Sequence, residues 1–295
     1  MPDLDCIVAG EANVDLLIDG IAKLEFDKEK LAKGCGLTLG GSSAITAYNL
    51  SKLGATVGFA TVVGQDLFGG YVEERLASAG IDLAALRRDR KQQTGITVWC
   101  QHGKRRAGMT YLGTIAGLRP TDLKTSYLRR ARHLHVGAYF LLQGFHEGAA
   151  KVFRQAKRLG MTTSLDCNFD PAEKWDSGIR EVLKHVDVFL PNETEACRLA
   201  GVSSVKDAAA DLATLAKVVV VKMGARGALL ATRQGTRRYP PVKARVVDAT
   251  GAGDSFNAGF LECYLRGGTL VESTRAGIAA GARSVEYIGG TAAFE

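Results

Sequence analysis

The chain has 295 residues, enough for two average domains or for one large α/β unit that carries an insertion. Hydrophobic residues make up 46% and charged residues 23%, which supplies a buried core and excludes wholesale disorder. The 38 Lys and Arg against 31 Asp and Glu leave a net charge of +7, which favours anionic ligands but is too small to indicate nucleic-acid binding.

The first residues contain no basic segment and only a short apolar run. We therefore expect no signal peptide, no membrane anchor and a cytoplasmic location. The cysteines form no Cys-x-x-Cys pair and have no His at ligand spacing, so we expect reduced, mostly buried thiols. They are Cys6, Cys35, Cys100, Cys167, Cys197 and Cys263.

A polar segment follows the first strand-like run, with the sequence Gly-Glu-Ala-Asn-Val-Asp at residues 10–15. The carboxylate of Asp15 can accept hydrogen bonds from two neighbouring hydroxyls, as a polyol would offer, although a turn residue fits the pattern as well. A second polar turn, at Gly40–Gly41, precedes a helical pattern over 44–53 that Gly54 ends. The backbone N–H groups of this turn could reach further ligand oxygens.

Two stretches, 15–38 and 94–113, contain strand-like pieces that run into polar turns without a following helix. We expect them to pair into a small antiparallel sheet that projects from the main domain as a lid. Two extended surface loops are the alternative. That alternative is disfavoured because Val98 and Trp99 would then need a covering surface.

Apolar runs alternate with helical patterns in the second half, most clearly at 162–165, 186–190 and 218–221. Each run is expected to be a strand that a helix follows. This alternation predicts an α/β fold with a doubly wound, mostly parallel sheet flanked by helices, and ligands beyond the carboxyl ends of the strands. His133 and His135 share one face of an earlier strand-like run, where packing is favoured over metal binding because no third ligand is evident.

Acidic and amide side chains follow two of these strands, at 165–170 and 190–195. Paired acids near an anion site are suited to hold Mg²⁺ through water, because that ion keeps much of its hydration. Asn192 and Glu195 would lie on one side of a first helical turn. The same spacing is that of a capping box, and the two roles are compatible.

The strongest motif is Asp-Ala-Thr-Gly-Ala-Gly-Asp-Ser-Phe-Asn-Ala-Gly-Phe at 248–260. Three small residues at 251–253 permit a tight turn, and aromatic residues four apart from Phe256 onward predict a helix. A glycine-rich turn that opens a helix presents unpaired N–H groups to a phosphate or oxyanion. A plain helix with Asp254 as its N-cap explains the segment equally well.

Other phosphate-binding and nucleophile motifs are absent from the sequence. Phe256 stands where a Rossmann fingerprint needs its last glycine, and the one Gly-Lys pair continues into Arg105 instead of the Ser or Thr of a Walker A loop. The hydrolase pattern Gly-x-Ser-x-Gly also fails, because Ser255 is followed by Phe and Asn.

Together and in this order, the motifs from Gly10 to about Gly290 resemble the ribokinase-like (PfkB) carbohydrate kinase family over essentially the whole chain. The segment 248–254 is the specific signature, and weaker matches lie at 10–15, 40–54, 63–69, 192–195 and 222–227. The resemblance implies one kinase domain over 1–295 and ATP-dependent phosphorylation of a hydroxyl on a sugar or sugar-like acceptor. It also implies a β lid that often forms a homodimer interface.

The resemblance further assigns roles to single residues. The catalytic group would comprise Asp254 as base and an anion hole of N–H groups at 252–254, in the turn formed by Gly251, Ala252 and Gly253. The acceptor would be held by Asn13, Asp15, Gly40 and Gly41. ATP would be bound by Asn192, Lys222, Gly224 and Gly227, with Glu195 holding Mg²⁺ through water. Asp248 and Thr250 match the place where some members bind a monovalent cation such as K⁺.

Two positions depart from the family pattern. Ile45 stands where many members have an acceptor-contacting Asn, which suggests an acceptor with fewer hydroxyls on that side. Asp170 stands where an anion-binding Arg often occurs, and Lys222 or Arg226 would then supply the positive charge. A phosphorylated acceptor would need a cationic cradle, for which Arg105 and Arg106 are the candidates.

The position of Asp254 near a helix N-terminus favours its ionised form. We therefore expect a weak base that orients the acceptor hydroxyl and receives the proton late. A nucleoside kinase of the adenosine or pseudouridine type is the nearest alternative function. A catalytically silent sugar or nucleotide sensor is another, although the intact segment 251–254 disfavours it. A dinucleotide-dependent oxidoreductase is a remote third option.

Overall fold

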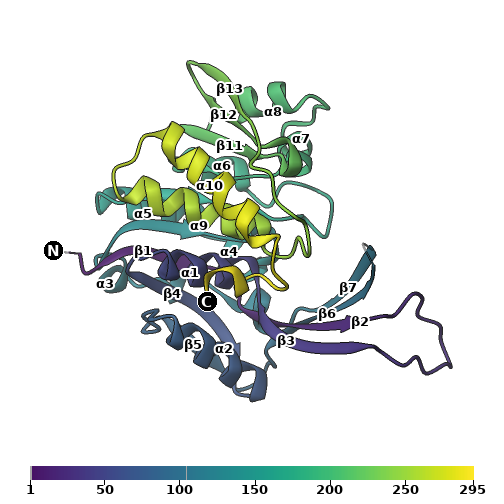
Figure 1. Cartoon of the computed structure of the whole chain (residues 1–295). Coiled ribbons are helices and arrows are strands. Elements are labelled where there is room, and N and C mark those ends of the chain that lie inside the picture. The colour runs from purple at the N-terminus through teal and green to yellow at the C-terminus, as the bar shows by residue number, and fades with distance from the viewer. Residues whose placement is uncertain (1, 104) are drawn as a thin grey trace.

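The computed structural model describes residues 2–103 and 105–295, without the side chains of Arg105 and Arg106. The cationic cradle predicted at these two arginines therefore lies outside the described part of the protein. The larger sheet has nine strands in the order β13-β12-β11-β10-β9-β8-β1-β4-β5 (Figure 1). Their bounds are β1 (Leu4–Ala9), β4 (Val57–Gly64), β5 (Leu86–Asp89), β8 (Ala131–Val136), β9 (Thr162–Leu165), β10 (Val188–Phe189), β11 (Val218–Lys222), β12 (Ala228–Thr232) and β13 (Gly235–Tyr239).

In the order in which they lie in the sheet, β5, β4, β1, β8, β9, β10 and β11 each pair in parallel with their neighbours. This pairing confirms the predicted mostly parallel sheet. The prediction of a helix after β11 is wrong. A 3₁₀ turn, η4 (Gly224–Arg226), reverses the chain instead, and β12 and β13 continue antiparallel. Gly227 makes this reversal possible, because its φ is +87° and a Cβ there would lie 2.0 Å from the carbonyl oxygen of Tyr239.

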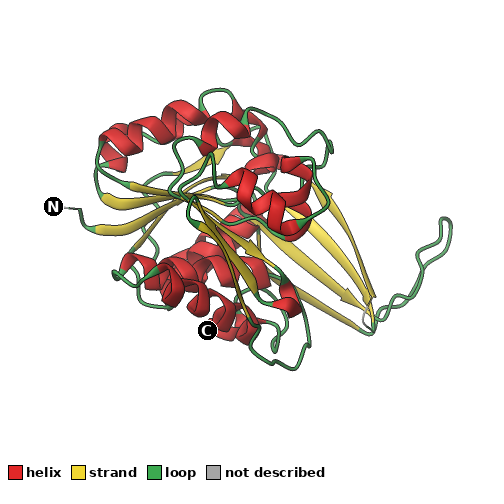
Figure 2. Ribbon diagram, turned by 90° about the horizontal axis from the view of Figure 1, so that it is seen from above, coloured by secondary structure: helices red, strands yellow, loops and turns green. Residues whose placement is uncertain are grey.

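Helices cover both faces of this sheet, as Figure 2 shows. One face carries α1 (Ser42–Lys52), α2 (Leu67–Ser78), α9 (Ala252–Leu265) and α10 (Leu270–Ser284). The other face carries α3 (Thr125–Leu128), α4 (Gln143–His146), α5 (Ala149–Arg158), α6 (Ile179–Leu183), α7 (Glu193–Ala200) and α8 (Val205–Leu212). The valines of β11 alternate between these two cores, which explains why a continuous apolar run forms a central strand.

Strand β1 lies inside the sheet. The next strands in the chain, β4 and β5, are added on one side of β1, and β8 to β13 are added on its other side. The order of strands therefore reverses between β1 and β8. In open α/β sheets ligands bind at such a reversal, outside the carboxyl ends of the strands. The loops after β1, β8, β9 and β11 meet at this edge and provide the side chains described below.

A second sheet projects to the right in Figure 1, with the order β3-β2-β6-β7. Its strands are β2 (Asn13–Asp19), β3 (Gly34–Gly40), β6 (Gly95–His102) and β7 (Arg105–Tyr111). The two stretches thus form the predicted small sheet, and both hairpins are antiparallel as expected, whereas β2 and β6, where the hairpins meet, pair in parallel. The reason is that β2 follows β1 and β6 follows β5, and both hairpins leave the main sheet from its carboxyl edge.

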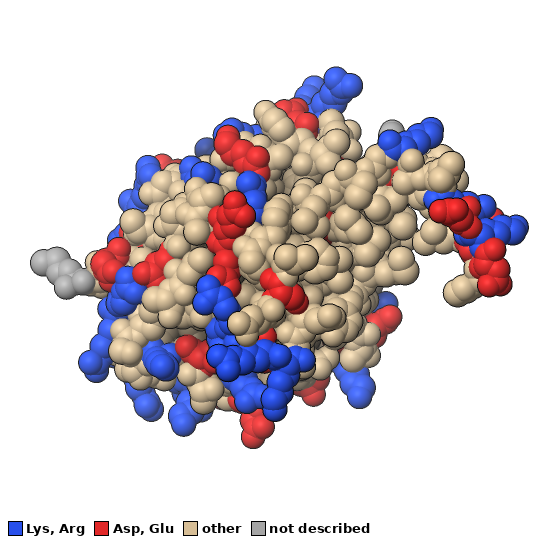
Figure 3. Space-filling view, turned by 90° about the horizontal axis from the view of Figure 1, so that it is seen from below, with Lys and Arg blue, Asp and Glu red and all other residues tan. Residues whose placement is uncertain are grey.

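The face drawn in Figure 3 carries positive and negative side chains in mixture, including on the projecting loop between β2 and β3. On this loop, Lys23, Lys28 and Lys30 surround Glu25 at 3.8, 3.3 and 2.7 Å. Such exposed pairs contribute little to stability, because water and salt screen them. No described helix is long and apolar enough to cross a membrane.

The six cysteines are free thiols, as expected. Only Cys6 and Cys167 are buried, and Cys35 is exposed, so the expectation of mostly buried thiols is wrong. Cys35 lies on β3, a strand at the edge of the projecting sheet. The local sequence pattern does not reveal this, because exposure here depends on the position of the strand within the sheet.

His133 and His135 lie on one face of β8, as the alternation predicts, and both are fully buried. The hydroxyl of Ser164 joins them, at 2.7 Å from Nε2 of His133 and 2.7 Å from Nδ1 of His135. Burial lowers the pKa of His133 to about 3 and that of His135 to about 4. Both rings are therefore neutral in the folded protein at neutral pH.

We expect these histidines to make the protein less stable in acid. An unfolded histidine binds a proton near pH 6.5, whereas these folded rings do not, so each one lowers the free energy of unfolding by about 1.4 kcal/mol per pH unit below that value. Urea unfolding at pH 7 and pH 5 measures this slope. His133→Gln should reduce the slope, and replacement of the exposed His102 should not; equal slopes in all three proteins would contradict the argument.

Candidate active site at the carboxyl edge of the sheet

Helix α9 begins with a glycine-rich turn at the reversal point of the sheet. Its N-cap is Gly251, with a φ of +71°, and no side chain caps the helix. Asp254 is the third helical residue, so the alternative that made it the N-cap is wrong. The N–H of Ala252 donates to the carbonyl of Ala249 at 3.3 Å, whereas those of Gly253 and Asp254 have no acceptor within their own helix. The turn is therefore suited to bind an anion chiefly through Gly253 and Asp254.

The side chain of Asp254 is partly buried and lies in a crowded, charged environment. Its pKa is raised well above the usual range, first by burial and then by the nearby carboxylates of Asp166 and Glu11. The Lys222 ammonium and a hydrogen bond with Ser42 act in the opposite direction but do not compensate. This upward shift runs against the expectation of a weak base held ionised by the helix dipole, because burial and the repulsion of neighbouring carboxylates act in the opposite direction.

Lys222, at the end of β11, faces the carboxylates of the site. Its ammonium nitrogen lies 2.6 Å from Oδ2 of Asp166, which follows β9, and 3.2 Å from Oδ1 of Asn257 on α9. Burial by itself would lower the pKa of Lys222. The nearby carboxylates of Asp166 and Glu195 raise it by more than burial lowers it, so the net shift is upward. This cation neutralises a pair of buried acids that would otherwise repel each other.

Asn192 and Glu195 form the capping box of α7. The side chain of Asn192 accepts from the N–H of Glu195 at 3.0 Å, and Glu195 accepts from the N–H of Asn192 at 2.8 Å. Burial and the neighbouring Asp166 raise the pKa of Glu195 to about 7. The capping interpretation is thus confirmed, and the same carboxylate lies near Asp166 and Lys222.

The four predicted acceptor residues come together at the base of the projecting sheet. Asn13 pairs with Gly40 across β2 and β3, and its Nδ2 donates to Oδ1 of Asp15 at 3.0 Å. A Cβ on Gly40 would lie 2.2 Å from that same oxygen, so only glycine permits this close approach. Gly41 has a φ of +92° and turns the chain into α1.

Two further predicted groups lie on loops at this edge. Gly224 and Gly227 flank η4, directly after Lys222. Asp248 accepts from the N–H and the hydroxyl of Thr250 at 2.9 and 2.7 Å, and from the N–H of Gly289 at 2.9 Å. The Asp248 carboxylate thereby ties the loop before α9 to the C-terminal loop.

The two residues that depart from the family pattern have structural roles. Ile45 is buried against the glycines of the α9 turn and the C-terminal loop, where a Cβ on Gly290 would lie 2.5 Å from its Cδ1. Asp170 accepts from the N–H groups of Ala172, Lys174 and Trp175 at 2.9, 2.9 and 2.7 Å. Asp170 therefore organises the loop after β9, which an arginine could not do in this way.

Three polar residues of this site escaped the sequence analysis as functional candidates: Glu11, Ser42 and Asn257. Ser42 and Asn168 are joined by a hydrogen bond of 3.3 Å between segments 126 residues apart. Asn257 donates to Asp166 from α9. Their one sequence signal is position, because each lies within a few residues of a strand end or a glycine-rich turn.

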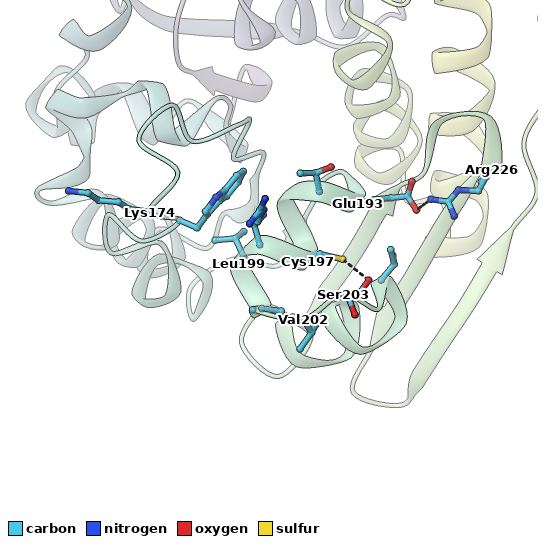
Figure 4. A pocket seen from close by; sticks show the side chains of 13 residues that line it. Lys174, Glu193, Cys197, Leu199, Val202, Ser203 and Arg226 are labelled. Carbon is cyan, nitrogen blue, oxygen red and sulfur yellow. Dashed lines mark hydrogen bonds and ion pairs between the residues drawn. The ribbon is translucent and has the colours of Figure 1, made fainter.

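A cleft of about 900 Å³ lies beside α7, where Glu193 and Thr194 line it next to Glu195 (Figure 4). The ion pair between Glu193 and Arg226 stands at one end, and Cys197 and Ser203 lie on its floor. None of the predicted catalytic or acceptor residues lines it. Arg226 connects the cleft to η4.

Comparison with known proteins gives consistent matches over nearly the whole chain. The model of the pfkB family of carbohydrate kinases matches residues 3–295. The ATP-dependent ribose-1-phosphate kinase of Halopiger xanaduensis is 29% identical over 276 residues, which cover 93% of this chain and 89% of the relative. The 5-dehydro-2-deoxygluconokinase of Lacticaseibacillus casei is 30% identical over 276 residues, covering 88% and 83%.

A solved structure agrees with these sequence matches. The ribokinase of Thermotoga maritima is 26% identical and superposes with a TM-score of 0.84. The match covers 98% of this chain and 95% of the ribokinase chain. The match confirms the expected ribokinase-like architecture, including a second, smaller sheet. Because the family model spans almost every residue and its motifs meet at one edge of the sheet, this chain belongs to the pfkB family of carbohydrate kinases.

Proposed function

We propose that this carbohydrate kinase transfers the γ-phosphoryl group of ATP to a hydroxyl of a sugar or sugar-like acceptor, held between Asp254 and the group of Asn13 and Asp15. The observation that carries the proposal is the first turn of α9, which presents the partly buried carboxylate of Asp254 and N–H groups without an acceptor in the helix at the reversal point of the sheet. The ribose-1-phosphate kinase relative, which is named as ATP-dependent, supports ATP as the donor.

Two groups of this turn would act on the reacting atoms. The N–H groups of Gly253 and Asp254 would bind the equatorial oxygens of the phosphoryl group, where one preorganised donor contributes on the order of 10²-fold to 10³-fold in rate. Asp254 would accept the proton of the acceptor hydroxyl as its oxygen bonds to phosphorus. The upward shift in pKa makes Asp254 a stronger base than an ordinary aspartate.

Glu195 offers carboxylate oxygens, the hard ligands that a hydrated Mg²⁺ ion prefers. Glu195 would hold Mg²⁺ through water, and the ion would neutralise charge on the phosphates. Lys222 and the turn of Gly224 and Gly227 would bind ATP. Asp248 and Thr250 would provide oxygens for K⁺, which a comparison of rates in K⁺ and tetramethylammonium salts tests.

The projecting sheet would be the lid of one kinase domain over 1–295. Its two faces differ: Thr38, Asp15, Thr97 and Thr110 form a row on one face, and Leu37, Leu16, Val98 and Met109 form a row on the other. The polar row would face the acceptor. Leu37 and Met109 are 39% and 57% exposed, so the apolar row would pair with a second copy, and Met109→Lys should shift a dimer toward monomer in light scattering.

Gly40→Ala should weaken acceptor binding selectively. The added methyl would collide with Asp15, so KM for the acceptor should rise about tenfold or more while ATP binding stays unchanged. Gly36→Ala is the matched control on the same strand, because nothing lies within 4 Å of its Cβ position. Steady-state kinetics with both substrates varied makes the comparison, and equal KM values for the two variants would contradict the assignment of the acceptor site.

The acceptor is identified by ADP release from ATP and Mg²⁺ across a panel of candidate sugars. The panel includes ribose, ribose 1-phosphate, fructose 6-phosphate, keto-deoxy sugar acids, fructoselysine and nucleosides, with Asp254→Asn as the inactive control. Turnover with one sugar class that the control lacks supports the proposal. Turnover only with a nucleoside would favour the nucleoside kinase, and ligand binding without any turnover would favour the sensor.

A further inference from the structure

Helix α1 has no cap of its own. Its N-cap is Gly41, which lacks a side chain, and its first turn contains no acidic residue. The first N–H groups of a helix need an acceptor and a compensating negative charge, which a capping side chain ordinarily provides. The turn before this helix carries the predicted acceptor residues Gly40 and Gly41, so a mobile helix start would disturb the site.

Glu11, from the connection between β1 and β2, supplies the missing acceptor. Its side chain is almost fully buried, and its Oε1 accepts from the N–H of Ser43 at 3.3 Å. Its Oε2 accepts from the hydroxyl of Ser43, and the N–H of Ser42 also points to the carboxylate. A residue 32 positions away in the chain therefore caps α1.

The backbone around this contact is shaped to hold it. A Cβ on Gly10 would lie 1.9 Å from the hydroxyl oxygen of Ser43, and a Cβ on Gly137 would lie 2.5 Å from it. These glycines follow β1 and β8, the two strands at the reversal point of the sheet. The hydroxyl of Ser43 therefore occupies the space that a side chain at position 10 or position 137 would need.

The same helix turn touches the proposed base. Ser42, the first residue of α1, lies beside the carboxylate of Asp254, whose pKa it lowers, and its hydroxyl accepts from Nδ2 of Asn168 at 3.3 Å. The hydroxyl of Thr46, one turn later, donates to the carbonyl of Asp254 at 3.4 Å. A displacement of the start of α1 would therefore move the contacts of Asp254 directly.

We propose that Glu11 is a positioning residue of the phosphoryl-transfer site. Its carboxylate caps α1 from a distant segment of the chain. The cap holds Ser42 against Asp254 and the Gly40–Gly41 turn against the acceptor. This inference rests on the proposed function, because it takes Asp254 as the base and the Gly40–Gly41 turn as part of the acceptor site. It adds a residue that contacts neither substrate in this assignment.

The charge of Glu11 has a second consequence for Asp254. The groups that face Asp254 are Asp166 from β9, Lys222 from β11, Ser42 from α1 and Glu11 itself. Burial raises the pKa of Glu11 to about 7, against the hydrogen bonds from Ser43, and the Glu11 charge in turn raises the pKa of Asp254. Removal of that charge should therefore move the acid limb of the pH–rate profile to lower pH.

Two variants separate these effects. Glu11→Gln keeps the shape and an oxygen acceptor for Ser43 but removes the charge, so kcat should stay within about tenfold while the acid limb of kcat moves to lower pH. Glu11→Ala removes the cap, so kcat/KM for the acceptor should fall about 10-fold to 100-fold with the Kd of ATP unchanged. Hydrogen exchange should also accelerate at the first turn of α1, residues 42–46.

Glu272→Ala is the matched control, because Glu272 is the capping-box carboxylate of α10 and lies exposed, outside the site. It should raise exchange at the start of α10 without any shift in the pH profile. An unchanged pH profile in Glu11→Gln, or unchanged exchange over 42–46 in Glu11→Ala, would overturn the role of Glu11. Absence of turnover in the unmodified protein across the sugar panel would instead overturn the proposed function, since the exchange measurement does not depend on turnover.

Discussion

Asp254→Asn should abolish turnover and leave ATP binding intact. The amide has the size of the carboxylate but neither its charge nor its ability to accept the hydroxyl proton, and loss of a positioned base costs on the order of 10²-fold to 10⁴-fold in rate. The pKa of Asp254 is already raised by burial, so a neutral side chain is tolerated at this position and the fold should survive. Single-turnover kinetics and calorimetric titration with ATP measure the two quantities separately.

Glu262→Gln provides the control on the same helix. Glu262 pairs with Arg266 on the exposed side of α9, near the helix end opposite to the glycine-rich turn. Such a pair contributes at most about 1 kcal/mol to stability and nothing to the site. Turnover of Asp254→Asn close to that of Glu262→Gln would remove Asp254 from the mechanism.

Gly251→Ala should reduce kcat on the order of 10²-fold to 10³-fold, the effect of losing preorganised donors at the transferred phosphoryl group. Gly251 has a φ of +71°, and a Cβ there would lie 2.6 Å from the Cα of Gly290. The contact is with backbone, which has no flexible end to move aside. The turn itself must shift, and the N–H groups of Gly253 and Asp254 would lose their alignment.

The backbone cost of this change is controlled for by Gly267→Ala, near the other end of α9. Gly267 has a φ of +87°, but nothing lies within 4 Å of its Cβ position. Both variants should lose about 1 kcal/mol of stability from the left-handed conformation. Only Gly251→Ala should lose activity, so equal rates in the two variants would show that the turn is not an anion hole.

Features that depend on neighbouring residues were predictable from the sequence. The strand over 162–165 and the helix that ends before Gly54 match the structure closely, because side-chain periodicity and glycine stereochemistry act over a few residues. The glycine-rich turn before α9 is equally local, since its small residues allow the backbone to bend. Family membership followed from these motifs, because they are short segments in a set order.

Features that depend on distant segments were decided only by the tertiary structure. The parallel pairing of β2 with β6 depends on the edge from which both hairpins leave the main sheet. The hairpin after β11 depends on the close approach of Gly227 to Tyr239.

The electrostatic state of Asp254 was also decided by the tertiary structure, because the carboxylates of Asp166 and Glu11 that act on it lie in connections far apart in the chain. The sequence by itself thus determined which chemical groups this protein carries and the family to which it belongs. Folding decided which groups face one another, because burial and Coulomb repulsion depend on distances that sequence spacing does not contain.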